Sequence, residues 1–249
     1  MEKATLRGAF SEKILQEAKK DRDIVVVCTD SRGSASLGTY PQELPEQFVE
    51  MGIAEQNSVT VSAGMASRGK KVFAIGPASF YSMRSAEQVK VDVAYSHNNV
   101  KIIGISGGIS YGALGATHHS LQDIALMRAI PNIIVEIPSD ANQMKALVDQ
   151  FLADPTPAYV RVGRGGVPVI YSEDTQAAIG KAIPWGDGKD IGIIACGQMV
   201  WRALEAAKLL EEEGIHATVL DMHTIKPLDE EAVVTLAKEC GCILTVEEH

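Results

Sequence analysis

The sequence has few cysteines and aromatic residues, no long apolar run and no basic cluster. Aromatic residues make up 5% of the 249 positions, and 4 positions are cysteine. No apolar run approaches the roughly 20 residues of a membrane-spanning helix, so we expect no membrane partner. The net charge of −9, without a basic cluster, argues against nucleic acid or anionic membranes as partners. Residues 1–5 contain no apolar signal core, so we expect a cytoplasmic protein.

The four cysteines do not follow the pattern of a disulfide framework or a zinc site. Cys28 and Cys196 lie in apolar runs that are typical of buried strands, which suits reduced core thiols. Cys240 and Cys242 are too closely spaced for an ordinary zinc ribbon, and there is no second pair. We interpret all four as structural residues in a reducing compartment.

The composition is typical of a globular α/β protein with one large domain or two modest ones. Apolar residues make up 46% of the chain and charged residues 22%. Apolar runs of strand length alternate with segments of helical periodicity as far as residue 162. The expected strands cover 24–28, 71–75, 100–106, 133–137 and 158–162, and the expected helices 5–20, 54–68, 82–96, 120–129 and 139–152. This alternation predicts a doubly wound, mostly parallel sheet with helices on both faces.

A second, smaller α/β unit follows the first. Residues 167–188 contain Pro168, Pro184 and several glycines, and we interpret them as a linker between domains 1–166 and 189–249. Beyond the linker, the expected strands are 190–196, 217–221 and 243–246, and the expected helices are 199–213 and 228–240. Because three strands form a small sheet with an exposed edge, we expect this domain to be truncated; a naturally short version is the alternative.

Polar residues follow several of the expected strands. Glu55 begins the helix 54–68, and its position alone indicates only an ordinary glutamate that complements the helix dipole. The other candidate segments are 30–34, 80–84 and 115–119. Because ligands of open parallel sheets bind at the carboxyl ends of the strands, we expect all four to converge. His118 and His119 have no nearby cysteine and no helical i, i+4 partner, so we expect no zinc site.

A set of short motifs in this order resembles transketolases. The motifs are Gly52-Ile53-Ala54-Glu55-Gln56, Phe80-Tyr81, Glu87-Gln88-Val89, Gly115-Ala116-Thr117-His118 and Ile130-Pro131-Asn132. Each motif alone is weak, whereas the ordered set is specific. More narrowly, residues 5–249 look like the C-terminal subunit of a split transketolase. The resemblance implies a thiamine diphosphate pyrimidine-binding domain followed by the beginning of the transketolase C-terminal domain.

The resemblance implies an enzyme of carbohydrate metabolism that transfers a two-carbon ketol unit between phosphorylated sugars, as in the pentose phosphate pathway. In that family a carboxyl group against N1′ of the cofactor's aminopyrimidine favours the tautomer that takes the C2 proton, and Glu55 matches it. Tyr81 matches the aromatic residue that stacks on this ring; Phe80 is its neighbour, and Arg84 ends the same cofactor-binding segment. Asp30 matches an aspartate near the cofactor. The alternatives are core packing for the aromatic residues and a loop-capping role for Asp30.

The same resemblance implies a set of substrate-binding residues. His118 matches the histidine that faces the reacting substrate oxygen and transfers protons. Ser34 and Arg164 match residues that hold the sugar phosphate, for which the planar donor fork of arginine is suited. Ser106 and Leu114 stand where typical transketolases have a histidine and an aspartate that contact sugar hydroxyls. These two departures leave the sugar pair open, including a modified or shorter sugar.

One half of the cofactor site has no match in this chain. Gly186-Asp187-Gly188 looks like the start of the motif that binds Mg²⁺ and diphosphate, but that motif requires a later asparagine. No asparagine follows Asn142, so we interpret the triplet as a turn. The resemblance then implies that a separate N-terminal subunit binds Mg²⁺ and the diphosphate. The expected assembly is a dimer or heterotetramer with the cofactor at the interface.

Other functions share this architecture. One alternative is a beta-type subunit of a 2-oxoacid dehydrogenase, and another is a relative of deoxyxylulose phosphate synthase. The Gly-Ala-Thr-His loop and the Ile-Pro-Asn segment favour transketolase or the synthase. A non-catalytic regulatory subunit is a third alternative, and the combined presence of Glu55, Tyr81 and His118 argues against it.

Overall fold

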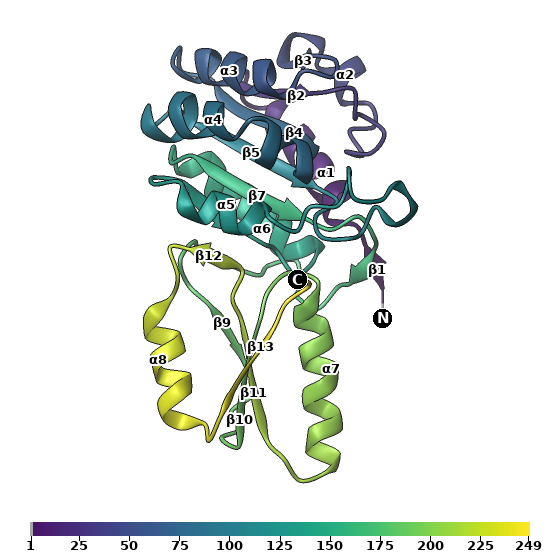
Figure 1. Cartoon of the computed structure of the whole chain (residues 1–249). Coiled ribbons are helices and arrows are strands. Elements are labelled where there is room, and N and C mark those ends of the chain that lie inside the picture. Colours follow the sequence, from purple (N-terminus) through teal and green to yellow (C-terminus); the bar gives the residue numbers. More distant parts are fainter. Residues whose placement is uncertain (1) are drawn as a thin grey trace.

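A seven-stranded sheet organises the larger part of the computed structural model, which describes residues 2–249 (Figure 1). The strand order is β12-β6-β7-β5-β4-β2-β3. The parallel strands are β2 (Ile24–Cys28), β3 (Phe48–Glu50), β4 (Lys71–Pro77), β5 (Val100–Ile105), β6 (Ile134–Glu136) and β7 (Ala158–Val162). The remaining strand, β12 (Thr224–Lys226), comes from the C-terminal part of the chain and is antiparallel to β6. The predicted doubly wound, mostly parallel sheet is therefore confirmed.

Helices cover both faces of this sheet. On one face, α1 (Leu6–Ala18) and α6 (Ala141–Ala153) pack on Val26, Phe73 and other residues of alternate strand positions. On the other face, α3 (Glu55–Ala66) and α5 (Asp123–Ala129) pack on the intervening positions, such as Val25 and Val72. Burial on both faces is the reason that β2 is a continuous apolar run.

The helix that follows β4 differs from the prediction at its start. Strand β4 continues through Pro77, although we expected Gly76 to end it. A π-helical turn (Phe80–Arg84) then leads into α4 (Ala86–Gln88) and a second π-helical segment (Val89–Tyr95). Phe80 and Tyr81 therefore lie in the first helical turn rather than in the connection between the predicted strand 71–75 and the predicted helix 82–96.

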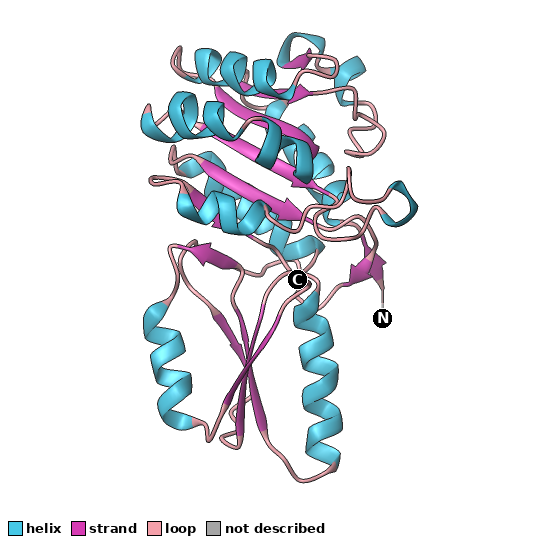
Figure 2. Cartoon of the chain, viewed as in Figure 1, coloured by secondary structure: helices cyan, strands magenta, loops and turns pink. Residues whose placement is uncertain are grey.

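The second sheet has four strands in the order β13-β10-β11-β9, not the three that we expected. Its strands are β9 (Ile183–Trp185), β10 (Ile191–Ala195), β11 (Ala217–Asp221) and β13 (Ile243–Val246). The additional strand, β9, lies inside the predicted linker and is antiparallel to β11. Pro184 indicated a break, but β9 is an edge strand, where proline is tolerated. Helices α7 (Met199–Glu212) and α8 (Glu230–Glu239) cover the two faces of this sheet (Figure 2).

Several short elements were not predicted from the sequence. Strand β1 (Lys3–Ala4) pairs with β8 (Val167–Pro168). The segment before β3 contains α2 (Tyr40–Glu43) and a 3-10 turn (Pro45–Gln47). The N-cap of α6 is Asp140, one residue after the start of the predicted helix 139–152, and its carboxylate accepts the Gln143 amide hydrogen.

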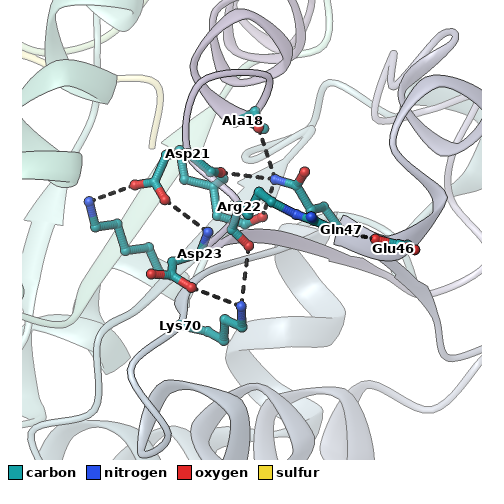
Figure 3. Close-up of polar contacts among 9 residues, drawn as sticks. Ala18, Asp21, Arg22, Asp23, Glu46, Gln47 and Lys70 are labelled. Carbon is teal, nitrogen blue, oxygen red and sulfur yellow. Dashed lines mark hydrogen bonds and ion pairs between the residues drawn. The ribbon is translucent and has the colours of Figure 1, made fainter.

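The side chain of Gln47 connects three elements near the start of the sheet (Figure 3). Its amide nitrogen donates to the carbonyl oxygens of Ala18, Asp21 and Ile24 at 2.9–3.0 Å. These carbonyls belong to the end of α1, to the connection that follows it and to the start of β2. The contacts therefore fix the position of β3, which leads directly to Glu55.

Candidate functional site

The predicted segments converge at one edge of the seven-stranded sheet. The carboxyl ends of five neighbouring strands, in the order β7-β5-β4-β2-β3, lie along this edge. Each strand is followed by a predicted segment or by a predicted site residue. Residues 30–34 follow β2, the segment with Glu55 follows β3, and residues 80–84 follow β4. The loop with His118 follows β5, and Arg164 follows β7. The parallel arrangement thus brings together side chains that are far apart in the sequence.

Glu55 is a buried carboxylate paired with an arginine. It is the first residue of α3, and only 1% of it is exposed. Arg84 donates from Nη1 to Glu55 Oε2 at 2.5 Å, and 42% of the Arg84 side chain is exposed. The guanidinium carbon of Arg84 lies 4.5 Å from the centre of the Phe80 ring. A buried charge, its counter-ion and an aromatic ring are therefore adjacent.

The contacts continue from Phe80 across the edge of the sheet. The ring centres of Phe80 and His118 are 5.1 Å apart, with the rings inclined at 62°. The ring of His118 also contacts that of Tyr111, with 5.2 Å between the ring centres and the rings inclined at 70°. The guanidinium carbon of Arg164 lies 4.7 Å from the centre of the Tyr111 ring. We call Glu55, Arg84, Phe80, His118, Tyr111 and Arg164 the site row, because each contacts the next.

The loop that carries His118 is closed at its base. Gly108 and Ser120 exchange backbone hydrogen bonds of 2.9 and 2.8 Å, so residues 109–119 form a lobe. His118 Nδ1 lies 3.0 Å from Thr117 Oγ1. That contact engages one ring nitrogen, so Nε2 is the nitrogen available for proton transfer to a ligand. His119 is turned back into the lobe, with Nε2 3.1 Å from the Gly112 carbonyl oxygen.

Tyr81 lies beneath the site row rather than in it. Its side chain is completely buried, and its hydroxyl is 2.8 Å from the Ser58 hydroxyl of α3. Burial raises the pKa of the Tyr81 phenol well above its usual value. The aromatic side chain that has exposed surface beside Glu55 is Phe80. The predicted stacking surface of Tyr81 is therefore covered in this chain alone.

Asp30 and Ser34 lie in the loop after β2, and Asp30 lines a hollow that none of the site-row residues lines. Asp30 is exposed, and its amide donates to Glu50 Oε1 at 2.7 Å. With Arg32, Gly33 and Gln42 it lines an open hollow of about 430 Å³. The carbonyl oxygen of Ser34 accepts a 2.6 Å hydrogen bond from Arg7. The structure thus places these two residues near the edge of the sheet but outside the site row.

The two departures from the transketolase pattern differ in their surroundings. Ser106 is fully buried directly after β5, where its hydroxyl has no partner among residues 2–249. Leu114 is exposed on the lobe, in the 3-10 turn Gly112–Leu114. A buried serine and an exposed leucine cannot reproduce a histidine and an aspartate that contact sugar hydroxyls.

A buried ionic cluster packs against the base of the lobe, next to Gly107. Most of its residues were not predicted from the sequence. Arg161 contacts Asp123 at 3.5 Å and Glu248 at 2.9 Å, and the Tyr159 hydroxyl donates to Asp123 at 2.7 Å. Burial raises the pKa of Glu248. Arg161 packs so closely under the lobe that a Cβ on Gly107 would lie 2.0 Å from its Nε. Arg161 is therefore engaged, whereas the half-exposed Arg164 is available to a ligand.

Tyr111 is the other residue that sequence reasoning missed. It contacts two predicted site residues, but it lies in a glycine-rich segment without a distinctive pattern. Its position in the loop after β5 was the only signal that could have identified it.

Among residues 2–249, no group of three or more histidine, cysteine, aspartate or glutamate side chains could hold a metal ion. None of the helices there is long and apolar enough to cross a membrane.

Two protein-family descriptions match this chain. Residues 2–169 match the transketolase pyrimidine binding domain, and residues 180–249 match the transketolase C-terminal domain. Together these two matches span both sheets.

Several proteins are similar over nearly the whole chain. One subunit of the apulose-4-phosphate transketolase of Phocaeicola vulgatus is 55% identical over 98% of this chain and 78% of its own length. A putative transketolase C-terminal section of Methanocaldococcus jannaschii is 39% identical over 98% of this chain and 77% of its own length. A 6-deoxy-6-sulfo-D-fructose transketolase subunit of a Clostridium species is 38% identical over 99% and 77%.

Solved structures have the same fold. A split-gene transketolase, described as an inactive beta4 tetramer, superposes with a TM-score of 0.90 and 38% identity. The match covers 98% of this chain and 80% of that one. The transketolase of Campylobacter jejuni gives a TM-score of 0.88 at 19% identity, over 99% of this chain and 40% of that one, which shows the fold alone.

Proposed function

This chain belongs to the transketolase family, and on that premise we propose that it is the C-terminal subunit of a split, thiamine diphosphate-dependent transketolase. It transfers a two-carbon ketol unit between phosphorylated sugars together with an N-terminal subunit. The observation that carries the proposal is the site row, in which a buried carboxylate, an aromatic ring and a histidine follow one another along one sheet edge.

The site row fits the aminopyrimidine end of thiamine diphosphate. A buried carboxyl such as Glu55 can hold a ring nitrogen away from water, where a hydrogen bond is strong. Phe80, which has exposed surface, supplies the aromatic wall, and the buried Tyr81 packs beneath it. Arg84 is within reach of the same cofactor, and Asp30 lies nearby on the loop after β2. Once bound, the cofactor supplies the carbanion chemistry, while Glu55 orients and tunes its ring.

The other end of the site row suits a sugar phosphate. His118 has a free ring nitrogen and can transfer a proton to or from the reacting substrate oxygen. Arg164 presents a guanidinium for the phosphate, and Ser34 is a second candidate for that group. The spacing of these groups along the edge of the sheet supports a substrate that carries a carbonyl at one end and a phosphate at the other.

The N-terminal subunit provides the Mg²⁺ and diphosphate site in this proposal. Residues 2–249 contain no candidate metal cluster, and Gly186 to Gly188 lie in the connection between β9 and β10. Large apolar side chains are exposed on the segments that carry the site row, namely Ile53, Met83, Ile109 and Leu114. Exposed apolar side chains gathered around a site suit a partner surface. We propose a heterotetramer, or at least a heterodimer, with the cofactor at this interface.

For the substrate we propose apulose 4-phosphate first. The Phocaeicola vulgatus relative named for that sugar is 55% identical to this chain. Because Ser106 and Leu114 replace the residues that contact hydroxyls in typical transketolases, a sugar with an unusual hydroxyl pattern suits the site better than an ordinary pentose phosphate. Several 1-deoxy-D-xylulose-5-phosphate synthases are also similar, at 34–39% identity, although the match covers only 38–39% of their length.

The test combines this chain with a chain that carries the complete diphosphate motif. The two are purified together and assayed for ketol transfer to ribose 5-phosphate, with apulose 4-phosphate, xylulose 5-phosphate or pyruvate as donor. We expect transfer from a ketose phosphate, and Glu55→Gln is expected to lower kcat about 100-fold or more. Glu12→Gln, on the exposed side of α1, is the matched control and retains activity.

Each other outcome identifies a different function. Use of pyruvate alone would identify a synthase or 2-oxoacid dehydrogenase type of enzyme. A complex that assembles but transfers nothing would identify a regulatory subunit. Full activity of Glu55→Gln would remove Glu55 from the catalytic site.

A further inference from the structure

Tyr111 is the member of the site row to which neither the family motifs nor the predicted roles assign a function. It lies in the lobe 109–119, and only 8% of it is exposed. Its neighbours in the lobe, Ile109 and Leu114, are exposed. The lobe therefore buries its aromatic side chain and presents its aliphatic ones.

The buried ring of Tyr111 contacts two functional groups at once. The ring of His118 meets it nearly edge-on, at 5.2 Å and 70°, an arrangement that the aromatic quadrupole favours. The guanidinium of Arg164 lies 4.7 Å from its centre, within the range of a cation–π interaction. His118 and Arg164 come from the loops after two different strands, β5 and β7, so Tyr111 bridges these loops.

The surroundings hold Tyr111 in place. The Gly108–Ser120 hydrogen bonds close the base of the lobe, and Arg161 packs beneath Gly107. Phe80 also contacts His118, with 5.1 Å between the ring centres. The imidazole and the guanidinium are therefore held at a separation that the Tyr111 ring determines.

We propose that Tyr111 is a positioning residue that sets the distance between the proton-transferring His118 and the phosphate-binding Arg164. It thereby determines which sugar phosphates react. The inference rests on the proposed function and extends it to specificity. A sugar phosphate reacts when its carbonyl oxygen meets His118 while its phosphate meets Arg164. Since a displacement of about 1 Å can cost about 100-fold in rate, a flexible Arg164 would lose this selection.

The test compares Tyr111→Leu with Tyr111→Phe in the reconstituted two-subunit enzyme. Phenylalanine keeps the ring, and we expect it to retain the wild-type KM and kcat within about 2-fold. Leucine removes the ring, and we expect the KM for ribose 5-phosphate to rise about 10-fold or more. The KM for unphosphorylated ribose should change less than 3-fold, since that acceptor does not use Arg164. Transfer to phosphorylated acceptors of different chain length should become less selective.

A merely structural role would give a different result. Equal losses with ribose and ribose 5-phosphate, or equal losses in Tyr111→Phe and Tyr111→Leu, would overturn the proposal. If Tyr111→Leu does not fold, as judged by thermal unfolding, Tyr111→Met provides a flexible side chain of similar length for the same comparison. Failure of the proposed function is distinguishable, because the wild-type pair itself would then transfer no ketol unit.

A binding measurement gives the same answer without turnover. Inorganic phosphate is titrated into the two-subunit complex, and its dissociation constant is compared among wild type, Tyr111→Leu and Arg164→Gln. We expect weaker phosphate binding in both variants and unchanged binding in Tyr111→Phe. Wild-type phosphate affinity in Tyr111→Leu would contradict the role of Tyr111 in holding Arg164.

Discussion

The contact between Glu55 and Arg84 changes how the position of Glu55 is interpreted. A glutamate at the start of a helix is ordinary when it is exposed, because it only complements the helix dipole. Glu55 is buried, and its charge is balanced by Arg84 at 2.5 Å. The pair holds the carboxylate in the site, and Phe80 holds the guanidinium in turn.

The first prediction concerns this pair. Arg84→Gln should lower the free energy of unfolding by about 1–3 kcal/mol, because it leaves a buried carboxylate without its counter-ion. Urea denaturation of this chain measures the change. The partial exposure of Arg84 places the expected value toward the lower end of that range.

The control for Arg84 is a pair of similar geometry on the surface. Arg22 and Glu46 are also 2.5 Å apart, but their side chains are 82% and 78% exposed. Arg22→Gln should change the free energy of unfolding by less than about 0.5 kcal/mol. Equal effects of the two substitutions would show that burial of Glu55 has no energetic consequence.

At the scale of elements, the site depends on how short segments are attached to the sheet. Strand β3 has three residues and lies at the edge of the sheet, yet it leads to Glu55. Gln47 attaches this region to the end of α1 and to the start of β2 through three carbonyl oxygens (Figure 3). The buried amide of Gln47 thus holds this short strand to its neighbours, which in a longer strand the backbone hydrogen bonds of the sheet would do.

The second prediction concerns Gln47. Gln47→Met keeps the approximate volume but removes the donors, so the buried carbonyls lose a partner. We expect the free energy of unfolding to fall by about 1–3 kcal/mol. Hydrogen exchange should quicken in β3 and at the start of α3 before it quickens in β4.

Gln16→Met, at an exposed position of α1, is the matched control. It should change the free energy of unfolding by less than about 0.5 kcal/mol. Unchanged exchange in β3 of the Gln47 variant would show that other contacts hold the strand.

At the scale of the whole molecule, the second part of the chain is joined to the first through β12. Strand β11 belongs to the four-stranded sheet, whereas β12, the next strand in the sequence, pairs with β6 of the seven-stranded sheet. Beside it, His223 and Glu136 are fully buried, with Nδ1 2.9 Å from Oε2, and the Thr224 hydroxyl donates to the other carboxylate oxygen at 2.6 Å. Asp221 accepts hydrogen bonds from Ser139 and Gln143, both 2.8 Å. The junction is therefore polar and buried.

The third prediction concerns this junction. His223→Ala leaves the buried carboxylate of Glu136 without its charged partner and with only the Thr224 hydroxyl, and should lower the free energy of unfolding by about 3–5 kcal/mol. The double variant Glu136→Gln, His223→Gln removes both charges and should lose less. Calorimetry should resolve two transitions in His223→Ala where the wild type has one. A single unshifted transition would contradict the role of the pair.

The same pair predicts how stability depends on pH. Burial by itself lowers the pKa of His223, but the hydrogen bond and charge of Glu136 and the charge of Asp221 outweigh it, so the pKa is raised above 6.5. A raised folded-state pKa stabilises the protein fully below the unfolded value, and this stabilisation is lost as pH rises through the folded value.

We therefore expect the stability advantage of wild type over the double variant to be complete below about pH 6.5 and to shrink as the pH rises above that value. Urea denaturation at several pH values measures it. A difference that stays constant as the pH rises would show that folding does not raise the pKa of His223, and a difference that grows would show that folding lowers it.

Much of the first sheet could be predicted from local sequence. Strands β2 and β7 begin and end where the apolar runs do, because strands buried on both faces are apolar almost throughout. Strand β9 was missed because Pro184 resembles a linker residue, and β12 was missed because three residues of mixed polarity carry no periodic signal. The predicted position of Glu55 at the start of a helix was confirmed, whereas its ion pair with Arg84, itself a predicted cofactor-binding residue, was not predicted.

The sequence by itself determined the alternation of strands and helices and the polar segments that follow the strands. Those properties depend on residues that are close in the sequence, because the spacing of apolar residues differs between a helix and a strand. Only the tertiary structure decided that Arg84 pairs with Glu55, that Tyr81 is covered, and that Tyr111 joins His118 to Arg164. These contacts depend on the order of strands in the sheet, and that order is set by packing between segments far apart in the chain.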